Sequence, residues 1–285
     1  MSDLGEIKKY LGLNVIRNAN SLSIDQTEYI ETVAKKFEVE NVKNYLTPME
    51  ENLKLLPAQN ESKSLKYRNL IGSLLYISKA TRPDVSFAVN YLSRFQGNSS
   101  ETHFKYALRI LKYLLSTKNL KLTFFKGQNN LIFDAYADAD FGSDIIDRKS
   151  TSGILIRING TSILWQSKKQ KNVSLASTHS EYYAMSECVA ELLPIKGLLN
   201  DLNFQLSFPI PIYEDNKGAR DLANRGKFHK NSKHIDVSYH FVNDYVRQNV
   251  IKVIQISTND QISDILTKPL SKNKFLFFRN LLNLK

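Results

Sequence analysis

The stretch from Asp134 to Asp144 is the part of the chain best suited to binding a cation, since four of its eleven residues are aspartates. In a β-strand alternate side chains share a face, so Asp134, Asp138 and Asp140 would line one face while alanines line the other. Like charges gathered on one face are costly unless a cation neutralises them. The same pattern is also typical of a solvated edge strand that runs into an acidic turn, and the stretch alone leaves both interpretations open.

Three further acids stand at the ends of other predicted elements. Glu181 falls in the first turn of a helix that begins near Ser177, Asp215 closes a short apolar strand, and Asp264 lies at the start of a late helix. If they converge with Asp138 at one sheet edge, Mg²⁺ or Mn²⁺ would relieve their repulsion. Two such ions about 4 Å apart can activate a water for phosphodiester hydrolysis. Four acids among 28 can also coincide by chance.

The elements that would position these acids alternate between strand and helix. Asn159-Gly160 separates two β-rich runs and is a strong hairpin signal, so the acidic strand is expected to begin a three-stranded antiparallel meander. Pro194 is expected to end or kink the helix that carries Glu181. The remaining predicted elements are strands at 210–214 and 250–256, a helix at 237–246 and a helix that begins at Asp260.

Positive charge is concentrated in the middle of the chain. Residues 62–130 contain 12 Lys and Arg against two Asp and Glu, and they account for most of the net charge of +11. Within the predicted helix at 104–115, one stripe combines Lys105, Arg109 and Lys112 at spacings of four and three. A second basic patch, Lys168, Lys169 and Lys171, follows the third strand. Such surfaces point to a polyanionic partner, although an ordinary solvated helix face has the same pattern.

Composition indicates a globular chain of one large or two modest domains. Hydrophobic residues make up 42% and charged residues 24%, and the shifts in charge suggest boundaries near residues 61 and 130. A single cysteine, Cys188, excludes an internal disulfide framework and fits a reducing compartment. Without a long apolar run or a signal-peptide layout, we expect no membrane partner and an intracellular protein, in the cytoplasm or the nucleus and not secreted.

Eight motifs, in order along nearly the whole chain, resemble the C-terminal part of copia-type LTR-retrotransposon polyproteins, where the end of the reverse transcriptase is followed by a ribonuclease H domain. The motifs are residues 3–12, 67–76, 81–84, 147–153, 165–170, 212–216, 233–241 and 264–270.

This resemblance implies a ribonuclease H-like α/β fold at 131–270, in which a mixed five-stranded sheet, an antiparallel meander followed by parallel strands, is flanked by helices. It also implies a small α+β remnant of the polymerase palm at 1–61, a helical thumb or connection at 62–130 and a C-terminal helical tail at 271–285. The activity implied is endonucleolytic hydrolysis of RNA in RNA–DNA hybrids by two Mg²⁺ or Mn²⁺ ions. By motif, the catalytic and metal-binding residues would be Asp138, Glu181, Asp215 and Asp264. Substrate contacts are expected from Lys168, Lys169, Lys171 and Asn216, and the remainder of a reverse-transcriptase polyprotein is a further expected partner.

The sequence departs from the family pattern at several positions. The polymerase needs a Tyr-x-Asp-Asp turn, which this chain lacks, so we expect no DNA synthesis by this chain alone. His179 occupies a position that is often acidic in the family, and Phe141 replaces a tryptophan. A zinc site at His229, His234 and His240 is disfavoured because spacings of five and six do not place them on one helix face. A non-catalytic nucleic-acid-binding relic, or a structural remnant without a partner, remains the alternative to an enzyme. Within the acidic stretch, Asp134 is expected to be solvated.

Overall fold

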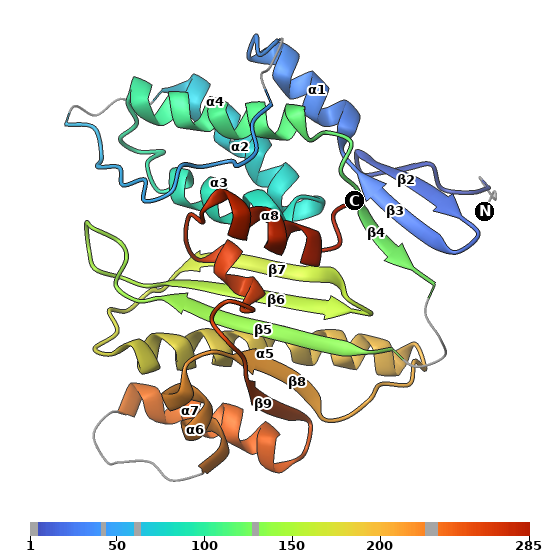
Figure 1. The fold of residues 1–285 in the computed structure, drawn as a ribbon, viewed down its shortest axis with the longest axis vertical. Helices are drawn as coiled ribbons and strands as arrows, with labels where there is room; N and C mark the ends of the chain where they lie inside the picture. The colour runs from blue at the N-terminus through green and yellow to red at the C-terminus, as the bar shows by residue number, and fades with distance from the viewer. Residues whose placement is uncertain (1–4, 41–43, 60–63, 127–130, 226–232) are drawn as a thin grey trace. The chain divides into compact units, whose positions relative to one another are not determined.

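The computed structural model of the chain describes residues 5–40, 44–59, 64–126, 131–225 and 233–285 (Figure 1). These residues form two compact units. The first unit contains residues 1–126 and 269–285, and the second contains residues 127–268. The predicted segments 1–61 and 62–130 therefore both contribute to the first unit, and so does the C-terminal tail.

The first unit has a four-stranded antiparallel sheet in the order β1-β2-β3-β4. Its strands are β1 (Lys9–Tyr10), β2 (Leu13–Asn18), β3 (Ser21–Asp25) and β4 (Leu122–Phe125). β2 and β3 form an antiparallel hairpin, whereas β4 lies in the segment 62–130 that was expected to be helical. β4 forms because it pairs with β3, so that Ser21 lies opposite Phe125. Because β3 is far from β4 in the sequence, no pattern among the residues of β4 itself predicts this pairing.

The helices of the first unit bury one apolar face each, as their helical spacing predicts. They are α1 (Thr27–Lys36), α2 (Leu65–Ala80), η1 (Pro83–Val85), α3 (Ser86–Ser93), α4 (Glu101–Ser116) and α8 (Lys272–Leu281). Between them lies a fully buried ion pair in which Arg82 donates two hydrogen bonds to Asp84, at 2.9 and 2.8 Å. The hydroxyl of Tyr113 on α4 also donates to Asp84, and Arg279 on α8 donates to that hydroxyl. This network connects the C-terminal helix to the rest of the unit.

The second unit contains a mixed five-stranded sheet in the order β7-β6-β5-β8-β9. Its strands are β5 (Phe133–Asp140), β6 (Thr151–Ile158), β7 (Thr161–Lys169), β8 (Ile210–Glu214) and β9 (Ile251–Gln255). β5, β6 and β7 form the antiparallel meander that was predicted, and β8 and β9 add to β5 as parallel strands. Asn159 and Gly160 both have positive φ, of 49° and 76°, as a tight hairpin turn requires. The predicted fold class, a mixed five-stranded sheet in which an antiparallel meander is followed by parallel strands, is confirmed.

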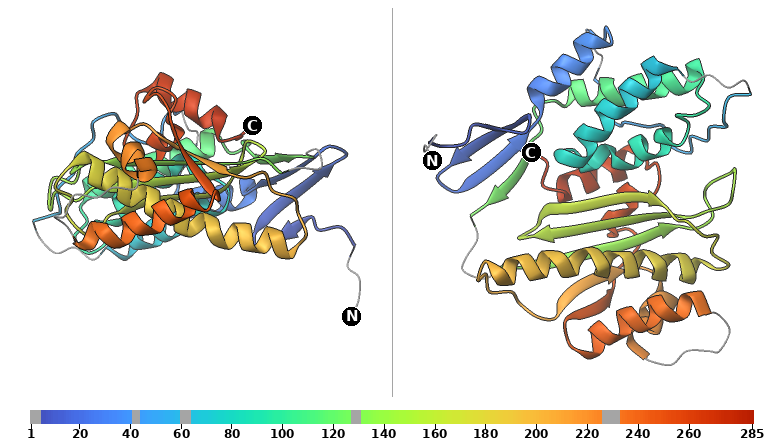
Figure 2. Two further views of the ribbon diagram at one scale, coloured as in Figure 1. Left: turned by 90° about the horizontal axis from the view of Figure 1, so that it is seen from below. Right: turned by 180° about the vertical axis from the view of Figure 1, so that it is seen from behind.

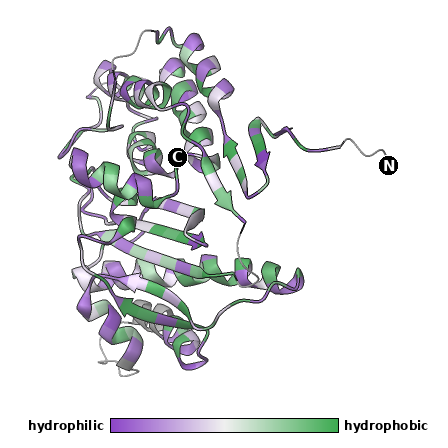
Figure 3. Cartoon of the chain, turned by 45° about the vertical axis from the view of Figure 1, so that its right-hand side comes forward, coloured by the Kyte–Doolittle hydropathy of each residue, from purple (hydrophilic) through white to green (hydrophobic). Residues whose placement is uncertain are grey.

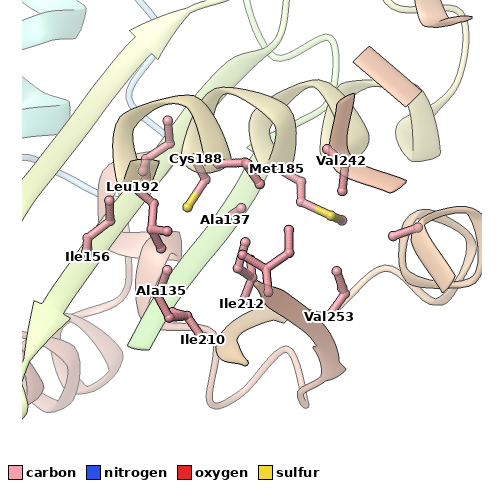
Figure 4. Close-up of a cluster of buried hydrophobic side chains, with 14 of the residues drawn as sticks. Ala135, Ala137, Ile156, Met185, Cys188, Leu192, Ile210, Ile212, Val242 and Val253 are labelled. Atoms are coloured by element: carbon pink, nitrogen blue, oxygen red, sulfur yellow. The ribbon is translucent and has the colours of Figure 1, made fainter. Parts of the chain in front are cut away.

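One long helix, α5 (Ser177–Asp201), packs against one face of this sheet (Figures 1 and 2). Alternation along β5 directs Ala135 and Ala137 into the core beneath α5, where they meet Met185 and Cys188 (Figure 4). The small alanines leave room for the helix to approach the sheet. Of the two outcomes expected at Pro194, an end of the helix is wrong, because α5 continues through this residue, and a kink stays a prediction. Proline removes a single backbone donor, and the packed neighbours Val189 and Leu192 hold the helix in place.

The remaining elements of the second unit are α6 (Lys217–Arg225), α7 (Lys233–Arg247) and η2 (Ile262–Leu266). The last of these was expected to be an ordinary helix but is a single short 3₁₀ turn. Pro269 follows closely, and the residue before a proline is disfavoured in the α region, which explains the early end.

Hydrophilic and hydrophobic residues alternate along most helices and strands, as expected for elements with one buried face (Figure 3). Among the described helices, none combines the length and the apolar character needed to cross a bilayer.

Candidate metal centre

Three of the four predicted acids meet at one edge of the sheet in the second unit. Asp138 on β5, Glu181 in the first turn of α5 and Asp215 directly after β8 each offer a carboxylate oxygen, and these oxygens all lie within 4.8 Å of one another. Asp138 and Glu181 are 2% and 7% exposed, and Asp215 is half-buried. The structure therefore brings together residues that are distant in the sequence: Glu181 follows Asp138 by 43 positions, and Asp215 follows Glu181 by 34.

The parallel pairing of β5 with β8 explains how two of these acids reach the same level. Tyr136 pairs with Tyr213 in the register, and both strands run in the same direction. Asp138 and Asp215 are each two residues further on, so they arrive together at the carboxyl end of the strands. Glu181 is fixed from the other side, because its carboxylate accepts a hydrogen bond from the backbone N–H of Ala139.

The carboxylates of this cluster are shielded from water, and burial disfavours their charged forms. Burial, together with the charge of Asp264, raises the pKa of Asp138 to about 7, and the ammonium of Lys268 opposes this rise. Burial and the nearby charges of Asp138 and Glu214 raise the pKa of Glu181 well above its ordinary value. Glu214, the last residue of β8, is completely buried beside them, and its pKa is also raised by burial. This fifth acid was not predicted from the sequence, although it directly precedes Asp215.

A hard divalent cation suits this donor set. The three converging groups are all carboxylates, which Mg²⁺ and Mn²⁺ prefer. Moreover, Oε2 of Glu181 is buried without a hydrogen-bond partner among the described residues, and such an atom is costly unless something binds it. Asp138, Glu181 and Asp215 are therefore the residues that would hold an ion. The alternative zinc site is not formed by described residues, since His229 lies outside them and His240 is exposed.

Asp264 has a different environment from the other three predicted ligands. It lies on η2, is completely buried and is not among the carboxylates that converge on one point. Its Oδ1 lies 2.6 Å from the ammonium of Lys268. Its charge nevertheless contributes to the raised pKa of Asp138, which places Asp264 close to the cluster. The proposed role of Asp264 as a metal ligand stays a prediction.

Two residues that position η2 were missed by the sequence analysis. The hydroxyl of Thr267 donates a hydrogen bond of 2.5 Å to Oδ2 of Asp138. Gly153 pairs with Asp138 across β5 and β6, and a Cβ there would lie 2.6 Å from the Thr267 methyl and 2.8 Å from the Ser263 carbonyl. Only glycine lets η2 lie directly on the sheet at this point. Both residues belong to motifs noted in the sequence, but their mutual contact could not be inferred from them.

The other aspartates of the acidic stretch have structural partners. Asp134 was expected to be solvated, and this is wrong: it accepts two hydrogen bonds from Arg157, at 2.8 and 2.6 Å. Arg157 lies opposite it on the neighbouring strand β6, a cross-strand contact that a single strand's pattern does not disclose. Asp144 closes the turn after β5 by accepting from the backbone N–H of Ile146.

The residues near the cluster that were predicted to contact nucleic acid differ in the contacts they make within the protein. Lys168 forms an ion pair with Glu187, at 2.7 Å, and Lys169 forms ion pairs with Asp144 and Asp147. Lys171 is exposed. The side chain of Asn216 accepts from the backbone N–H of Ala219 and thereby caps α6.

In the first unit, the predicted basic stripe on α4 is only partly free. Lys105 is exposed and Lys112 is half-buried, whereas Arg109 forms an ion pair with Glu50, at 2.9 Å, and lies over the ring of Tyr45. Part of this stripe thus stabilises the first unit itself. Whether these residues contact nucleic acid stays a prediction.

Comparisons with known proteins identify two kinds of relatives. Residues 1–51 match the family model described as reverse transcriptase (RNA-dependent DNA polymerase). The retrovirus-related Pol polyprotein from transposon TNT 1-94 of Nicotiana tabacum is 37% identical over 100% of this chain and 22% of its own length. The corresponding polyprotein from transposon RE1 of Arabidopsis thaliana is 37% identical over 98% of this chain and 19% of its own length. The chain thus spans about a fifth of the polyproteins it matches.

Among solved structures, two of the ribonuclease LC11-RNase H1, isolated from compost, are similar to this chain. One covers 49% of this chain and 94% of its own, at 14% identity and a TM-score of 0.37. The other, in complex with an RNA/DNA hybrid, covers 45% and 88% at 11% identity and a TM-score of 0.33.

Proposed function

The chain belongs to the Pol polyproteins of copia-type LTR retrotransposons, and we propose that residues 131–270 act in this family as a ribonuclease H, an endonuclease that hydrolyses the RNA strand of RNA–DNA hybrids with two divalent cations. The observation that carries this proposal is the convergence of three carboxylates, two of them almost completely buried, at the carboxyl edge of a sheet with this strand order.

Each residue of the cluster has its own role in this proposal. Asp138, Glu181 and Asp215 hold a cation, and Thr267 fixes the orientation of Asp138 through its hydroxyl. A divalent cation held by these carboxylates would supply Lewis-acid stabilisation of the phosphate and would lower the pKa of a water molecule bound to it. The half-buried Asp215 faces solvent most, so the substrate phosphate is expected to approach from its side. Asp264 is the fourth acid of the site in this proposal.

Substrate binding is assigned to the basic patch at the end of β7 and to Asn216. Lys171 is available as it stands, whereas Lys168 and Lys169 would exchange their carboxylate partners for phosphates of the hybrid. The ammonium of Lys168 is half-exposed, so giving up its pair with Glu187 costs little, whereas Lys169 would also leave the buried carboxylate of Asp144 and its release costs more. The remaining candidates are Lys105, Arg109 and Lys112 on α4.

The first unit is proposed to be the end of a reverse transcriptase. Residues 1–61 would be the remnant of the palm and residues 62–130 the thumb or connection, with 271–285 as a helical tail. No Tyr-x-Asp-Asp sequence is present in this chain, so DNA synthesis is not expected from it alone. The remainder of a Pol polyprotein is the partner that would supply it, and an intracellular site in cytoplasm or nucleus is proposed.

Cleavage of a labelled RNA–DNA hybrid in Mg²⁺ tests the function. We expect the chain to cut the RNA strand, and Asp138→Asn and Asp215→Asn to abolish cutting while hybrid binding persists. Asp201→Asn is the matched control, because this exposed aspartate lies at the opposite end of α5 from Glu181. Binding without cleavage at every metal concentration would contradict the proposal and favour a non-catalytic nucleic-acid-binding relic. Salt-insensitive binding, or none, would favour a structural remnant.

A further inference from the structure

Lys268 places a positive charge beside the candidate metal centre. Its ammonium lies 2.6 Å from Oδ1 of Asp264, which is completely buried, while 34% of the lysine side chain remains exposed. The two residues are four positions apart, with Asp264 in the middle of η2 and Lys268 two residues beyond its end. The lysine therefore occupies the space beside the fourth predicted metal ligand.

The position of this lysine is determined by packing and not by a flexible surface loop. Thr267, its direct neighbour, is completely buried and donates a hydrogen bond to Asp138. The missing Cβ of Gly153 lets Thr267 and Ser263 lie against β6. The backbone at Lys268 is thus held against the same strand pair that carries Asp138, and only the long side chain can move.

The charge of Lys268 acts on the carboxylates that a second cation would need. It interacts electrostatically with Asp138 and Asp140 as well as with Asp264, and an ordinary lysine side chain carries a positive charge at neutral pH. The ammonium is therefore charged beside the cluster. By contrast, the carboxylates of Asp138, Glu181 and Asp215 converge without contribution from Asp264.

We propose that Lys268 is a positioning residue that stands in for a second divalent cation: the free protein binds one ion at Asp138, Glu181 and Asp215, and a second ion reaches Asp264 only after the ammonium of Lys268 has withdrawn from it. This inference rests on the proposed function and adds an order of events to it. The exposed part of the side chain gives the ammonium a way out to solvent or to a substrate phosphate.

A purely structural role predicts something else. If the ion pair of Lys268 with Asp264 did no more than stabilise the turn, its loss would lower the stability of the protein without changing how many ions bind. The number of ions bound by the free protein separates the two roles, because it does not depend on cleavage.

Titration calorimetry of the full chain with Mn²⁺ and Mg²⁺, in the absence of nucleic acid, tests the proposal. We expect one ion per chain for the wild type and for Lys268→Arg, which keeps the charge. Lys268→Gln is expected to bind two ions, with the affinity of the second raised at least about tenfold. Adding Asp264→Asn to Lys268→Gln should return the count to one. Lys252→Gln, at an exposed lysine of β9, controls for loss of a positive charge elsewhere in the unit.

Two outcomes overturn the inference while leaving the proposed function intact: two ions of similar affinity in the wild type, or a single ion in a folded Lys268→Gln. The wild-type count alone decides the first, so the inference stays testable even if the variant does not fold. No ion binding by the wild type would instead contradict the metal centre itself, and with it the proposed function.

Discussion

Replacing Asp138 by asparagine should make the ion-free protein more stable while removing its response to metal. Burial raises the pKa of Asp138 to about 7, compared with 3.8 for an ordinary aspartate, so folding disfavours its ionised form. At a pH above both values this difference corresponds to about 4 kcal/mol. Asparagine removes the charge and can still accept the hydrogen bond from Thr267, but it buries an amide that costs about 1–2 kcal/mol. We therefore expect a net gain of about 2–3 kcal/mol in the free energy of unfolding.

The assay is urea unfolding in a chelator and again in Mg²⁺, followed by tryptophan fluorescence. Trp165 on β7 is the single tryptophan of the chain, so its signal reports the second unit alone. The wild type should gain stability when Mg²⁺ is added, by about 2.7 kcal/mol at a hundredfold excess over Kd, and Asp138→Asn should not. Asp201→Asn, as the control, should change stability by less than about 0.5 kcal/mol and keep the metal response.

A lower stability of Asp138→Asn than of the wild type, in the chelator above neutral pH, would contradict this prediction. That result would mean that the carboxylate of Asp138 is favourable in the folded state without a cation. The cluster would then need no ion to hold its charges together.

Three further predictions concern Asp138, Gly153 and the ion pair of Arg82 with Asp84. The wild type in chelator should lose stability as pH rises from about 4 to about 7, because the raised pKa of Asp138 makes its protonated form the one that favours folding. Urea midpoints across this range check this: Asp138→Asn should lose less stability than the wild type, because it lacks the raised pKa of Asp138 while those of Glu181 and Glu214 remain. Gly153→Ala should lower the free energy of unfolding by about 1–3 kcal/mol and weaken Mn²⁺ binding in calorimetry, because its Cβ would collide with the Thr267 methyl and the Ser263 carbonyl. The control is Gly197→Ala on α5, which has open space around it and should leave stability unchanged or raise it. Arg82→Met should destabilise the first unit by about 3–5 kcal/mol, since it leaves Asp84 buried without its partner; unfolding followed by circular dichroism should show this loss while Trp165 fluorescence stays unchanged.

Local sequence patterns were sufficient for much of the second unit. The Asn159-Gly160 turn and the alternation along β5 predicted the meander, since both depend on backbone and side-chain preferences within a few residues. They were not sufficient for β4, whose strand exists only because β3 pairs with it. Nor could they predict that α5 continues through Pro194, because the packing that holds this helix comes from distant residues.

For the candidate site, the sequence by itself determined which carboxylates were available and that Asp138, Glu181 and Asp215 stand at the ends of elements, where a sheet edge can gather them. Only the tertiary structure decided that these three converge, that Asp134 is neutralised by Arg157, and that Asp264 is paired with a lysine. The reason is distance along the chain. Thr267 meets Asp138 across 129 positions, so the contact depends on how η2 packs on β6, and no local pattern of residues encodes that packing.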